Sequence, residues 1–306
     1  MTGRGEFRVT AVQDAPAHLD RERTLYIAAE HIARAGAEKS DLVVFPEAFV
    51  PGYPDFVWRL GELDATAWVD RLRDQAVEIE GSHLDKVRSA AEAAGVWVAL
   101  GISEMDPSGT LFNAVVYIDD DGEIAGLHRK LVPTGHEAKV WARGEGPMLT
   151  VVDIRGVRVG ALICWENYMP LARAAFYEKG IDVLLAPTWD NSEEWVPTLR
   201  HIAKEGRVFV IGATAFLRGC DVTRDLPGAE AIYGGTDDFL SRGNSTIIAP
   251  GGEIIAGPLI GEAGTITETL ELDRITAGRL IFDPDGQYAR PDVLSLSIHT
   301  KGNQDE

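Results

Sequence analysis

The 306-residue sequence has few cysteines, a deficit of basic side chains and no long apolar run. Only Cys164 and Cys220 occur, in unlike contexts, which excludes a disulfide framework. No apolar stretch reaches the roughly 18 residues that a transmembrane helix requires. Lysine and arginine number 29 against 48 aspartates and glutamates, so the formal net charge is −19. Such an acidic chain is unsuited to nucleic acid or to an anionic membrane surface as a partner.

The remaining composition is that of a globular enzyme or binding protein. Hydrophobic residues make up 45% and charged residues 25% of the chain, which is close to average usage. The first residues, MTGRGEFRVTAVQD, lack an apolar core of signal-peptide length, so we expect a cytoplasmic protein. Length alone would allow two domains, but no repeat, low-complexity tract or linker divides the chain. We therefore expect one domain over residues 1–306.

Hydrophobic periodicity predicts an α/β fold. Helical spacing occurs in residues 20–38, 65–94, 168–179 and 195–206. Strand patterns occur in residues 7–13, 41–47, 96–104, 181–188, 207–216 and 265–273. Turn signals indicate hairpins over residues 111–130, 150–166 and 244–259. Hairpins mixed with strand–helix–strand units predict sheets that are not purely parallel. Residues 218–243, rich in glycine and aspartate, are expected to form a long loop with a lid or interface role.

Three polar residues each close a strongly apolar strand. Glu47 ends DLVVFPE, Lys130 ends EIAGLHRK, and Cys164 ends VRVGALIC. Strand ends that lead into loops are where α/β proteins commonly assemble their sites. A lone cysteine in such a place is more often a small buried hydrophobic residue than a nucleophile. A carboxylate, an ammonium group and a thiol together would instead supply a base, an electrostatic stabiliser and a nucleophile.

The residues after Cys164 support a reactive thiol. Asn167 is a candidate N-cap, and Pro170 fits the first turn of the helix that follows. A thiol near a helix N-terminus is favoured as the thiolate, its reactive form. The backbone N–H groups just after Cys164 are also candidate oxyanion donors. Cys220 lies in a polar loop without these features and is interpreted as incidental.

Several motifs resemble those of one known family. FPEAFVPGYP (45–54), HRKLVPTGHEAKVWARGEG (128–146) and CWENYMPLARAAFYEKGIDVLLAPT (164–188) closely resemble the nitrilase branch of the carbon–nitrogen hydrolase superfamily. The resemblance runs in consistent order from about residue 7 to 297, which leaves 298–306 as an expected disordered tail. It implies an α-β-β-α sandwich with two mixed sheets and helices outside. It also places a Glu-Lys-Cys triad on Glu47, Lys130 and Cys164, and a second glutamate on Glu137.

The sequence departs from the family pattern at two places. Gly135-His136-Glu137 stands where the family commonly has Tyr-Glu-Glu, and residues 142–146 replace a Gly-Gln-Gly-Asp-Gly-like stretch. Both changes lie near the expected mouth of the site, so the family's substrate preference is not carried over. The sequence ends soon after YARPDVLSL (288–296), whereas many relatives continue with a tail associated with spiral filaments, so we do not expect long filaments.

The resemblance implies a nitrilase that converts an organic nitrile to a carboxylic acid and ammonia. Glu47 would take the proton of Cys164, and the thiolate would attack the nitrile carbon to form a thioimidate and then a thioester. Lys130 and the backbone N–H of Trp165 would stabilise the charge that develops on nitrogen. Three alternatives stay open: a cyanide hydratase or dihydratase, an aliphatic amidase or N-carbamoyl hydrolase, and a non-catalytic binding protein on the same fold.

The substrate pocket is a further expectation. Tyr53, Trp141, Trp165 and Trp189 lie in the matched motifs near the expected site, and an aromatic lining would suit an apolar or aromatic nitrile. The seven histidines are scattered, and no His-x-x-x-His or Cys-x-x-Cys spacing suggests zinc, so no metal or cofactor is expected.

Family relatives associate into oligomers, so the resemblance implies at least a homodimer. The helix over residues 168–179 carries an apolar stripe, made of Met169, Ala172, Ala175 and Phe176. The stripe could face a second copy of the chain or its own sheet.

Overall fold

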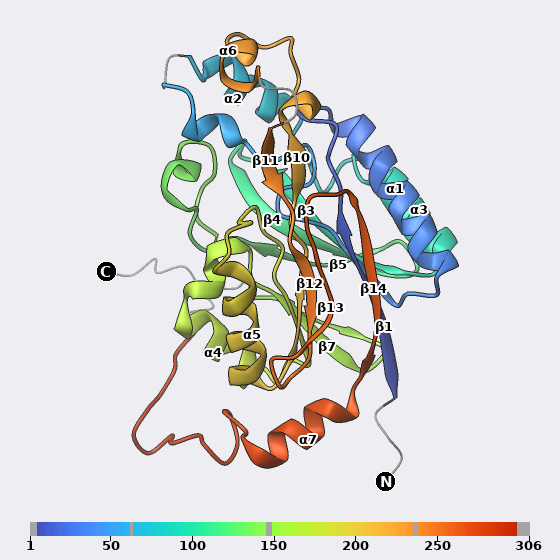
Figure 1. Ribbon diagram of the computed structural model, residues 1–306, viewed down its shortest axis with the longest axis vertical. Coiled ribbons are helices and arrows are strands. Elements are labelled where there is room, and N and C mark those ends of the chain that lie inside the picture. The colour runs from blue at the N-terminus through green and yellow to red at the C-terminus, as the bar shows by residue number, and fades with distance from the viewer. Residues whose placement is uncertain (1–4, 62–63, 145–148, 235–237, 299–306) are drawn as a thin grey trace.

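The structure of the protein is a computed structural model that describes residues 5–61, 64–144, 149–234 and 238–298. Two six-stranded mixed sheets lie face to face, and helices cover their outer faces (Figure 1). The α-β-β-α sandwich that the resemblance implies is confirmed. The expected tail over 298–306 lies outside the described residues except for residue 298. In the divergent stretch over 142–146, residues 142–144 are described.

The first sheet has the strand order β14-β1-β2-β3-β4-β5. Its members are β14 (Gly264–Glu271), β1 (Glu6–Gln13), β2 (Leu42–Val44), β3 (Trp97–Met105), β4 (Leu111–Ile118) and β5 (Ile124–Arg129). The pairs β1–β2 and β2–β3 are parallel, whereas β1–β14, β3–β4 and β4–β5 are antiparallel. The expected hairpin over 111–130 is thus β4 and β5.

The second sheet has the strand order β13-β12-β9-β8-β7-β6. Its members are β13 (Ile254–Leu259), β12 (Ser245–Ile248), β9 (Phe209–Gly212), β8 (Val183–Leu185), β7 (Val157–Ala161) and β6 (Val151–Ile154). The pairs β7–β8 and β8–β9 are parallel, and the pairs at the two edges are antiparallel. The hairpins over 150–166 and 244–259 are confirmed as β6–β7 and β12–β13, although β7 ends at Ala161.

The layer between the two sheets is the main core. Alternate residues of the strands point into it, for example Val9 and Ala11 of β1 against Val183 and Leu185 of β8, and all four are buried. Because strand side chains alternate between the two faces, the neighbouring residues point outward to the helices. Cys164 belongs to this inner cluster, so it packs against the apolar core between the two sheets.

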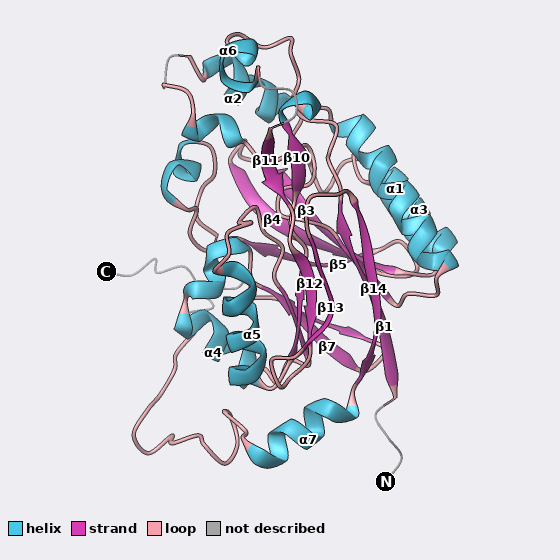
Figure 2. Cartoon of the chain, viewed as in Figure 1, coloured by secondary structure: helices cyan, strands magenta, loops and turns pink. Residues whose placement is uncertain are grey.

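Helices cover the outer face of each sheet (Figure 2). Two of them, α1 (Arg21–Ala37) and α3 (Asp85–Ala94), pack on the first sheet, and α4 (Pro170–Glu178) and α5 (Trp195–Gly206) pack on the second. Asp20 caps α1 by accepting a hydrogen bond from the N–H of Arg23. Ala172, Ala175 and Phe176 of α4 are buried on the second sheet, so most of the stripe on this helix faces its own sheet.

The structure corrects two element predictions. The helix expected over 65–94 is two helices, α2 (Thr66–Asp74) and α3, because Val77 between them pairs with the edge of β3 through hydrogen bonds with Ser103 and Met105. The segment 218–243 is not simply a loop. With the residues just before it, it forms a two-stranded sheet of β10 (Phe216–Arg218) and β11 (Phe239–Arg242), with α6 (Ala229–Tyr233) between the strands.

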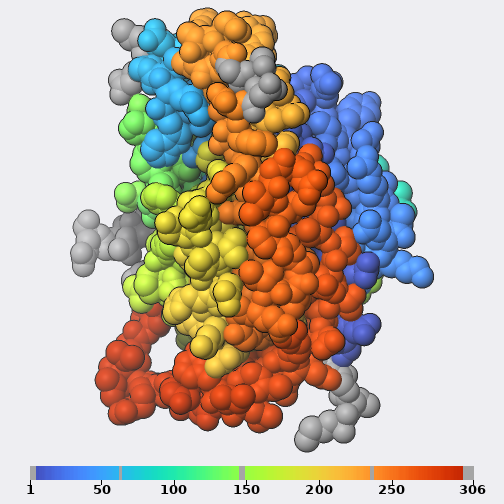
Figure 3. Space-filling model, in the orientation of Figure 1, coloured from blue at the N-terminus to red at the C-terminus, as the bar shows by residue number. Residues whose placement is uncertain are grey.

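The chain after β14 forms α7 (Asp273–Ile281), which the sequence pattern did not predict, and then an extended arm. In Figure 3 this arm borders the lower edge of the molecule, with an opening between it and the body.

No helix of the described residues is long and apolar enough to cross a membrane.

Candidate active site

Glu47, Lys130 and Cys164 come together where strands of both sheets end. Glu47 lies in the turn after β2, Lys130 follows β5 directly, and Cys164 follows β7. Glu47 and Lys130 are 1% exposed and Cys164 is 5% exposed. Three polar groups of this kind are rarely buried together unless they are partnered. The strand ends that the sequence singled out therefore do converge.

The turn that carries Glu47 depends on a close approach to β3. Ala48 has a left-handed φ of 48°, an unusual conformation for a residue with a side chain. A Cβ atom on Gly101 of β3 would lie 2.0 Å from the carbonyl oxygen of Pro46 and 2.8 Å from the N of Ala48. Glycine at position 101 is therefore what lets the Glu47 turn lie against the sheet.

Lys130 is held between two carboxylates. Its Nζ donates to Oε1 of Glu47 at 2.7 Å and to Oε2 of Glu137 at 2.7 Å. Burial alone would lower the pKa of Lys130, but Glu47 and the other anionic neighbours raise it above its ordinary value. The side chain therefore remains an ammonium group, and its position is set from two sides.

Each of the two carboxylates has further donors. Glu47 accepts hydrogen bonds from Nδ2 of Asn113 and from the backbone N–H of Trp189, both at 2.8 Å. Glu137, in a short 3-10 helix at Gly135–Lys139, accepts from the hydroxyl of Tyr53 at 2.8 Å. Burial, then Glu47, raises the pKa of Glu137, while Lys130 acts in the opposite direction.

The turn that carries Cys164 is a short 3-10 helix at Cys164–Tyr168, and α4 begins only at Pro170. Pro170 does occupy the first turn of α4, but Asn167 is not its N-cap. The Asn167 amide instead donates to the carbonyl oxygens of Leu162 and Cys164 at 2.7 and 2.9 Å. Cys164 itself has a left-handed φ of 53°, a strained conformation typical of functional turns.

The protonation state of Cys164 differs from the expectation. Burial raises the pKa of the thiol, Glu47 raises it further, and Lys130 lowers it. The net effect is a raised pKa, because desolvation of the thiolate outweighs the nearby ammonium group. The prediction of a favoured thiolate is wrong for the free protein, so the thiol needs a base that removes its proton during attack.

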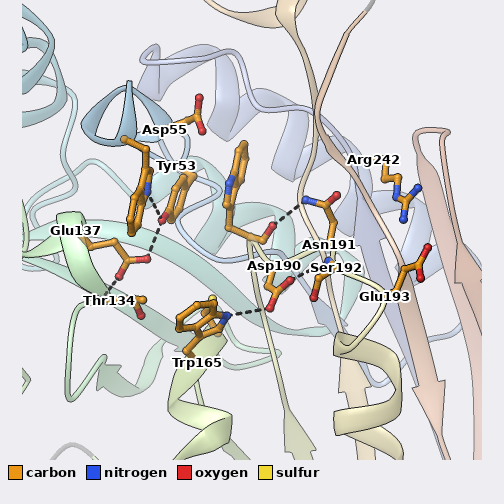
Figure 4. Close-up of a pocket in the computed structure, with 13 residues that line it drawn as sticks. Tyr53, Asp55, Thr134, Glu137, Trp165, Asp190, Asn191, Ser192, Glu193 and Arg242 are labelled. Carbon is orange, nitrogen blue, oxygen red and sulfur yellow. Dashed lines mark hydrogen bonds between the residues drawn. The ribbon is translucent and has the colours of Figure 1, made fainter. Parts of the chain in front are cut away.

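A cavity of about 610 Å³ reaches Cys164 and Glu137, whereas Glu47 and Lys130 are not among its lining residues. Tyr53, Trp165 and Trp189 are among its lining residues, together with Cys164 and Glu137. Figure 4 shows Tyr53 and Glu137 on one side and the indole of Trp165 below. The Trp165 Nε1 donates to Oδ2 of Asp190 at 2.8 Å, as the dashed line in Figure 4 marks.

Similarity to known proteins identifies the family of this chain. The model of the carbon-nitrogen hydrolase family matches residues 8–280, which is most of the sequence. The chain belongs to the carbon–nitrogen hydrolase family.

Two similar relatives are described as nitrilases. The chain is 39% identical over 298 residues to an aliphatic nitrilase of Sinorhizobium fredii strain HH103, and the matched region covers 96% of each protein. It is 37% identical over 303 residues to the bifunctional nitrilase/nitrile hydratase NIT4A of Nicotiana tabacum, and the matched region covers 95% of this chain and 85% of the relative. Among solved structures, Nit3 of Saccharomyces cerevisiae, a member of branch 10 of the nitrilase superfamily, has a TM-score of 0.74. That comparison covers 94% of this chain and 97% of Nit3 at 21% identity, so it concerns the fold.

In this carbon–nitrogen hydrolase, Trp141 does not lie where the sequence suggested. It is 2% exposed and is not among the residues that line the cavity. Its Nε1 donates to the Ser103 hydroxyl at 3.3 Å, and its ring packs edge-on against Tyr53. Trp141 therefore supports the wall of the cavity from behind.

Two polar residues of this carbon–nitrogen hydrolase were missed by sequence reasoning. Asn113 of β4 binds Glu47, and a hydrogen bond from Thr188 contributes to lowering the pKa of Cys164. Both residues are buried. Asn113 is a polar residue within the apolar run LFNAVVYI, and Thr188 ends the apolar run IDVLLAPT. A polar residue in such a run is the signal that would have identified them.

The two residues before Lys130 each contact an acidic side chain. His128 contacts Glu166 at 2.9 Å, and Arg129 forms a two-bond pair with Glu104 at 2.5 and 2.7 Å. Within the part of the chain that the structure describes, no group of three or more His, Cys, Asp or Glu side chains is arranged to hold a metal ion.

Proposed function

We propose that the protein is a nitrilase that hydrolyses an organic nitrile to a carboxylic acid and ammonia through a covalent intermediate on Cys164. The observation that carries the proposal is the buried Lys130 ammonium group between Glu47 and Glu137, whose charge acts on the thiol of Cys164, a residue that lines the cavity. The similarity to an aliphatic nitrilase over nearly the whole chain supports the same reaction.

The first step forms a carbon–sulfur bond. Glu47 accepts the proton of the thiol as the sulfur attacks the nitrile carbon, and Glu47 then gives that proton to the nitrogen, which yields a thioimidate. The raised pKa of Cys164 favours transfer of the proton during the attack. Lys130 and the backbone N–H of Trp165, in the first turn of the 3-10 helix, stabilise the charge on nitrogen.

Two waters complete the reaction. Glu47 activates the first water, which adds to the thioimidate carbon, and the resulting tetrahedral intermediate expels ammonia and leaves a thioester. The second water cleaves the thioester, releases the carboxylic acid and returns the proton to the thiol. The sum is one nitrile and two waters converted to one acid and one ammonia. Glu137 takes part as the group that orients Lys130.

A second product follows from the same intermediate. If the tetrahedral carbon expels the thiol instead of ammonia, the product is the amide. The similarity to a protein described as a bifunctional nitrilase/nitrile hydratase favours this branch as a side reaction. We propose that the acid is the main product and that some amide accompanies it.

The cavity supports an apolar or aromatic nitrile as substrate. Tyr53 and Trp189 stack with ring centroids 4.6 Å apart and planes 8° apart, and both line the cavity with Trp165. Flat apolar walls favour a flat or apolar substituent on the nitrile carbon. Trp141 is left out of this set because it lies behind Tyr53.

We propose that the protein acts as a homodimer or higher homo-oligomer in the cytoplasm. Large apolar side chains are exposed on α7 and the arm that follows, namely Leu280, Ile281, Tyr288, Val293 and Leu294. Exposed apolar groups gathered in one segment mark an interaction surface. Cys164 and Cys220 are both free, which suits a reducing compartment.

A substrate panel tests the proposed reaction. Phenylacetonitrile, benzonitrile, an aliphatic dinitrile, cyanide and the matching amides are supplied separately, and both ammonia and the organic product are quantified. We expect acid from nitriles, little use of added amides, and no turnover by C164A. Turnover of amides alone or of cyanide alone would assign the protein to a neighbouring reaction, and full activity of C164A would exclude the mechanism.

A further inference from the structure

A buried carboxylate two residues after Cys164 contacts both chain segments that carry the reactive groups. Glu166 is 1% exposed. Its Oε2 accepts a hydrogen bond from the backbone N–H of Ile163 at 2.6 Å, and its Oε1 accepts one from the backbone N–H of Leu131 at 2.7 Å. The same Oε2 lies 2.9 Å from Nε2 of His128. Since a carboxylate only accepts, this ring nitrogen carries the proton.

The two backbone donors are the chain neighbours of the two reactive residues. Leu131 follows Lys130 and Ile163 precedes Cys164. Lys130 follows β5 of the first sheet, and Cys164 follows β7 of the second sheet. One side chain therefore joins the ends of two strands that belong to different sheets.

Among the residues that the structure describes, the other backbone hydrogen bonds of Lys130 and Cys164 do not join β5 to β7. The N–H of Lys130 donates to the carbonyl of Asn113 in the first sheet, and its carbonyl accepts from Gly144. The N–H of Cys164 donates to the carbonyl of Pro187, which follows β8 of the second sheet. The carboxylate of Glu166 crosses between the two sheets at the level of the site.

We propose that Glu166 is a positioning residue that sets the distance and direction from the Lys130 ammonium group to the Cys164 sulfur. The inference rests on the proposed function, in which these two groups act on the same nitrile. Glu137 contacts the Lys130 side chain itself, whereas Glu166 acts through the backbone on either side. A misplacement of about 1 Å at a reacting group can reduce the rate by about 100-fold. The two hydrogen bonds from Glu166 to the N–H groups of Ile163 and Leu131, called the Glu166 clamp below, should therefore have a measurable effect on the rate.

The test is E166Q, made in a C220S background because Cys220 is an exposed second thiol. Glutamine keeps the size of the side chain, but one of the two carboxylate oxygens is replaced by an NH₂ group, which cannot accept a hydrogen bond. That NH₂ group then faces the backbone N–H of either Ile163 or Leu131. At least one of the clamping hydrogen bonds is thus lost. We expect kcat to fall by about 10- to 100-fold with KM changed by less than about threefold.

A second readout needs no nitrile. Lys130 lowers the pKa of the Cys164 thiol, so displacement of the ammonium group shifts the alkylation of Cys164 by iodoacetamide to higher pH. If the protein hydrolyses no nitrile at all, the proposed function fails while the alkylation profile still tests the clamp.

The matched control is E104Q in the same background. Glu104 is also buried, at 3% exposed, and its carboxylate binds the side chain of Arg129, the residue before Lys130. Within the described parts of the chain, Glu104 forms no hydrogen bond with the backbone next to Lys130 or Cys164. We expect E104Q to lower Tm while kcat, KM and the alkylation profile stay within about threefold of the parent values.

The proposal is overturned if E166Q lowers Tm as E104Q does but keeps the parent kcat and alkylation profile. A rise in KM at constant kcat also overturns it, because that result assigns Glu166 to substrate binding. If E166Q does not fold, E166D replaces it. The shorter acid keeps the charge but cannot span both segments, so it must show the same fall in kcat at constant KM. The variant H128Q, which leaves both backbone bonds in place, must lose less activity than either.

Discussion

The Nζ of Lys130 and Oε1 of Glu47 lie 2.7 Å apart, and both side chains are shielded from water. Removal of one partner from a buried pair leaves an uncompensated charge, which typically costs about 3–5 kcal/mol. Here Lys130 also binds Glu137, so its removal leaves two neighbouring carboxylates. The pair is therefore a stability determinant as well as a part of the proposed reaction.

Replacement of Lys130 should separate these two roles. We expect K130M to lower the free energy of unfolding by about 3–5 kcal/mol and to abolish measurable nitrile hydrolysis. The double variant K130M/E137Q should recover part of the stability, because one of the two carboxylates becomes neutral, and none of the activity. Urea denaturation and product assays check both points. Recovery of activity in the double variant would show that Lys130 has no role in the chemistry.

The hydroxyl of Tyr53 is expected to matter for turnover. It donates to Glu137, which holds Lys130, and a hydrogen bond to a charged group contributes about 1.5–3 kcal/mol. Y53F keeps the ring that stacks on Trp189, so we expect a roughly tenfold loss of kcat with little change in KM. Steady-state kinetics on one nitrile measure the effect.

A matched control for Y53F is Y117F. Tyr117 is also buried, and its hydroxyl has no hydrogen-bond partner among the described residues. Loss of that hydroxyl should leave kcat unchanged and should not lower Tm. Equal losses of kcat in Y53F and Y117F would contradict the role assigned to the Tyr53 hydroxyl.

Gly101 should tolerate no side chain. An added Cβ would lie 2.0 Å from the carbonyl oxygen of Pro46, so G101A must push the Glu47 turn away from β3. We expect a loss of about 1–3 kcal/mol of stability and a fall in kcat. G251A is the control, since nothing lies within 4 Å of a Cβ there. Thermal melts and product assays on both variants measure these effects. A wild-type kcat in G101A would contradict the role of Gly101 in placing the Glu47 turn.

Acid should destabilise the protein through His18. Burial lowers the pKa of this imidazole from 6.5 to about 4, so between these values the unfolded chain binds a proton that the folded protein does not. Stability is therefore independent of this group above pH 6.5 and falls as the pH decreases toward 4, by up to about 3 kcal/mol. The slope of unfolding free energy against pH should be smaller in H18N. An equal slope in both proteins would assign the acid sensitivity to other groups.

Local pattern was sufficient for much of the fold and part of the site. The helix over 195–206 has the predicted bounds, and the predicted hairpin over 111–130 is formed by β4 and β5, because periodicity and turn residues act over a few positions. Glu47, Lys130 and Cys164 could be selected because each is a polar residue at the end of an apolar run. Asn113 and Thr188 carry a weaker form of the same signal.

Other features depend on contacts between distant segments. The long helix expected over 65–94 is interrupted because Val77 pairs with β3. Trp141 is behind Tyr53 because both rings belong to one buried cluster that also includes residues of α2. Neither neighbour is near in sequence. Asn167 had the residue type of an N-cap but is used to hold the Cys164 turn.

The sequence by itself determined which residue types close the apolar strands, and with them the three groups suited to nucleophilic chemistry. Only the tertiary structure decided the charge state of those groups and their mutual positions. Burial between two sheets keeps the Cys164 thiol protonated and the Lys130 ammonium group paired, because desolvation and nearby charges depend on the surroundings. Glu166 joins the two sheets at that point, and its role follows from the packing of strands that lie far apart in the chain.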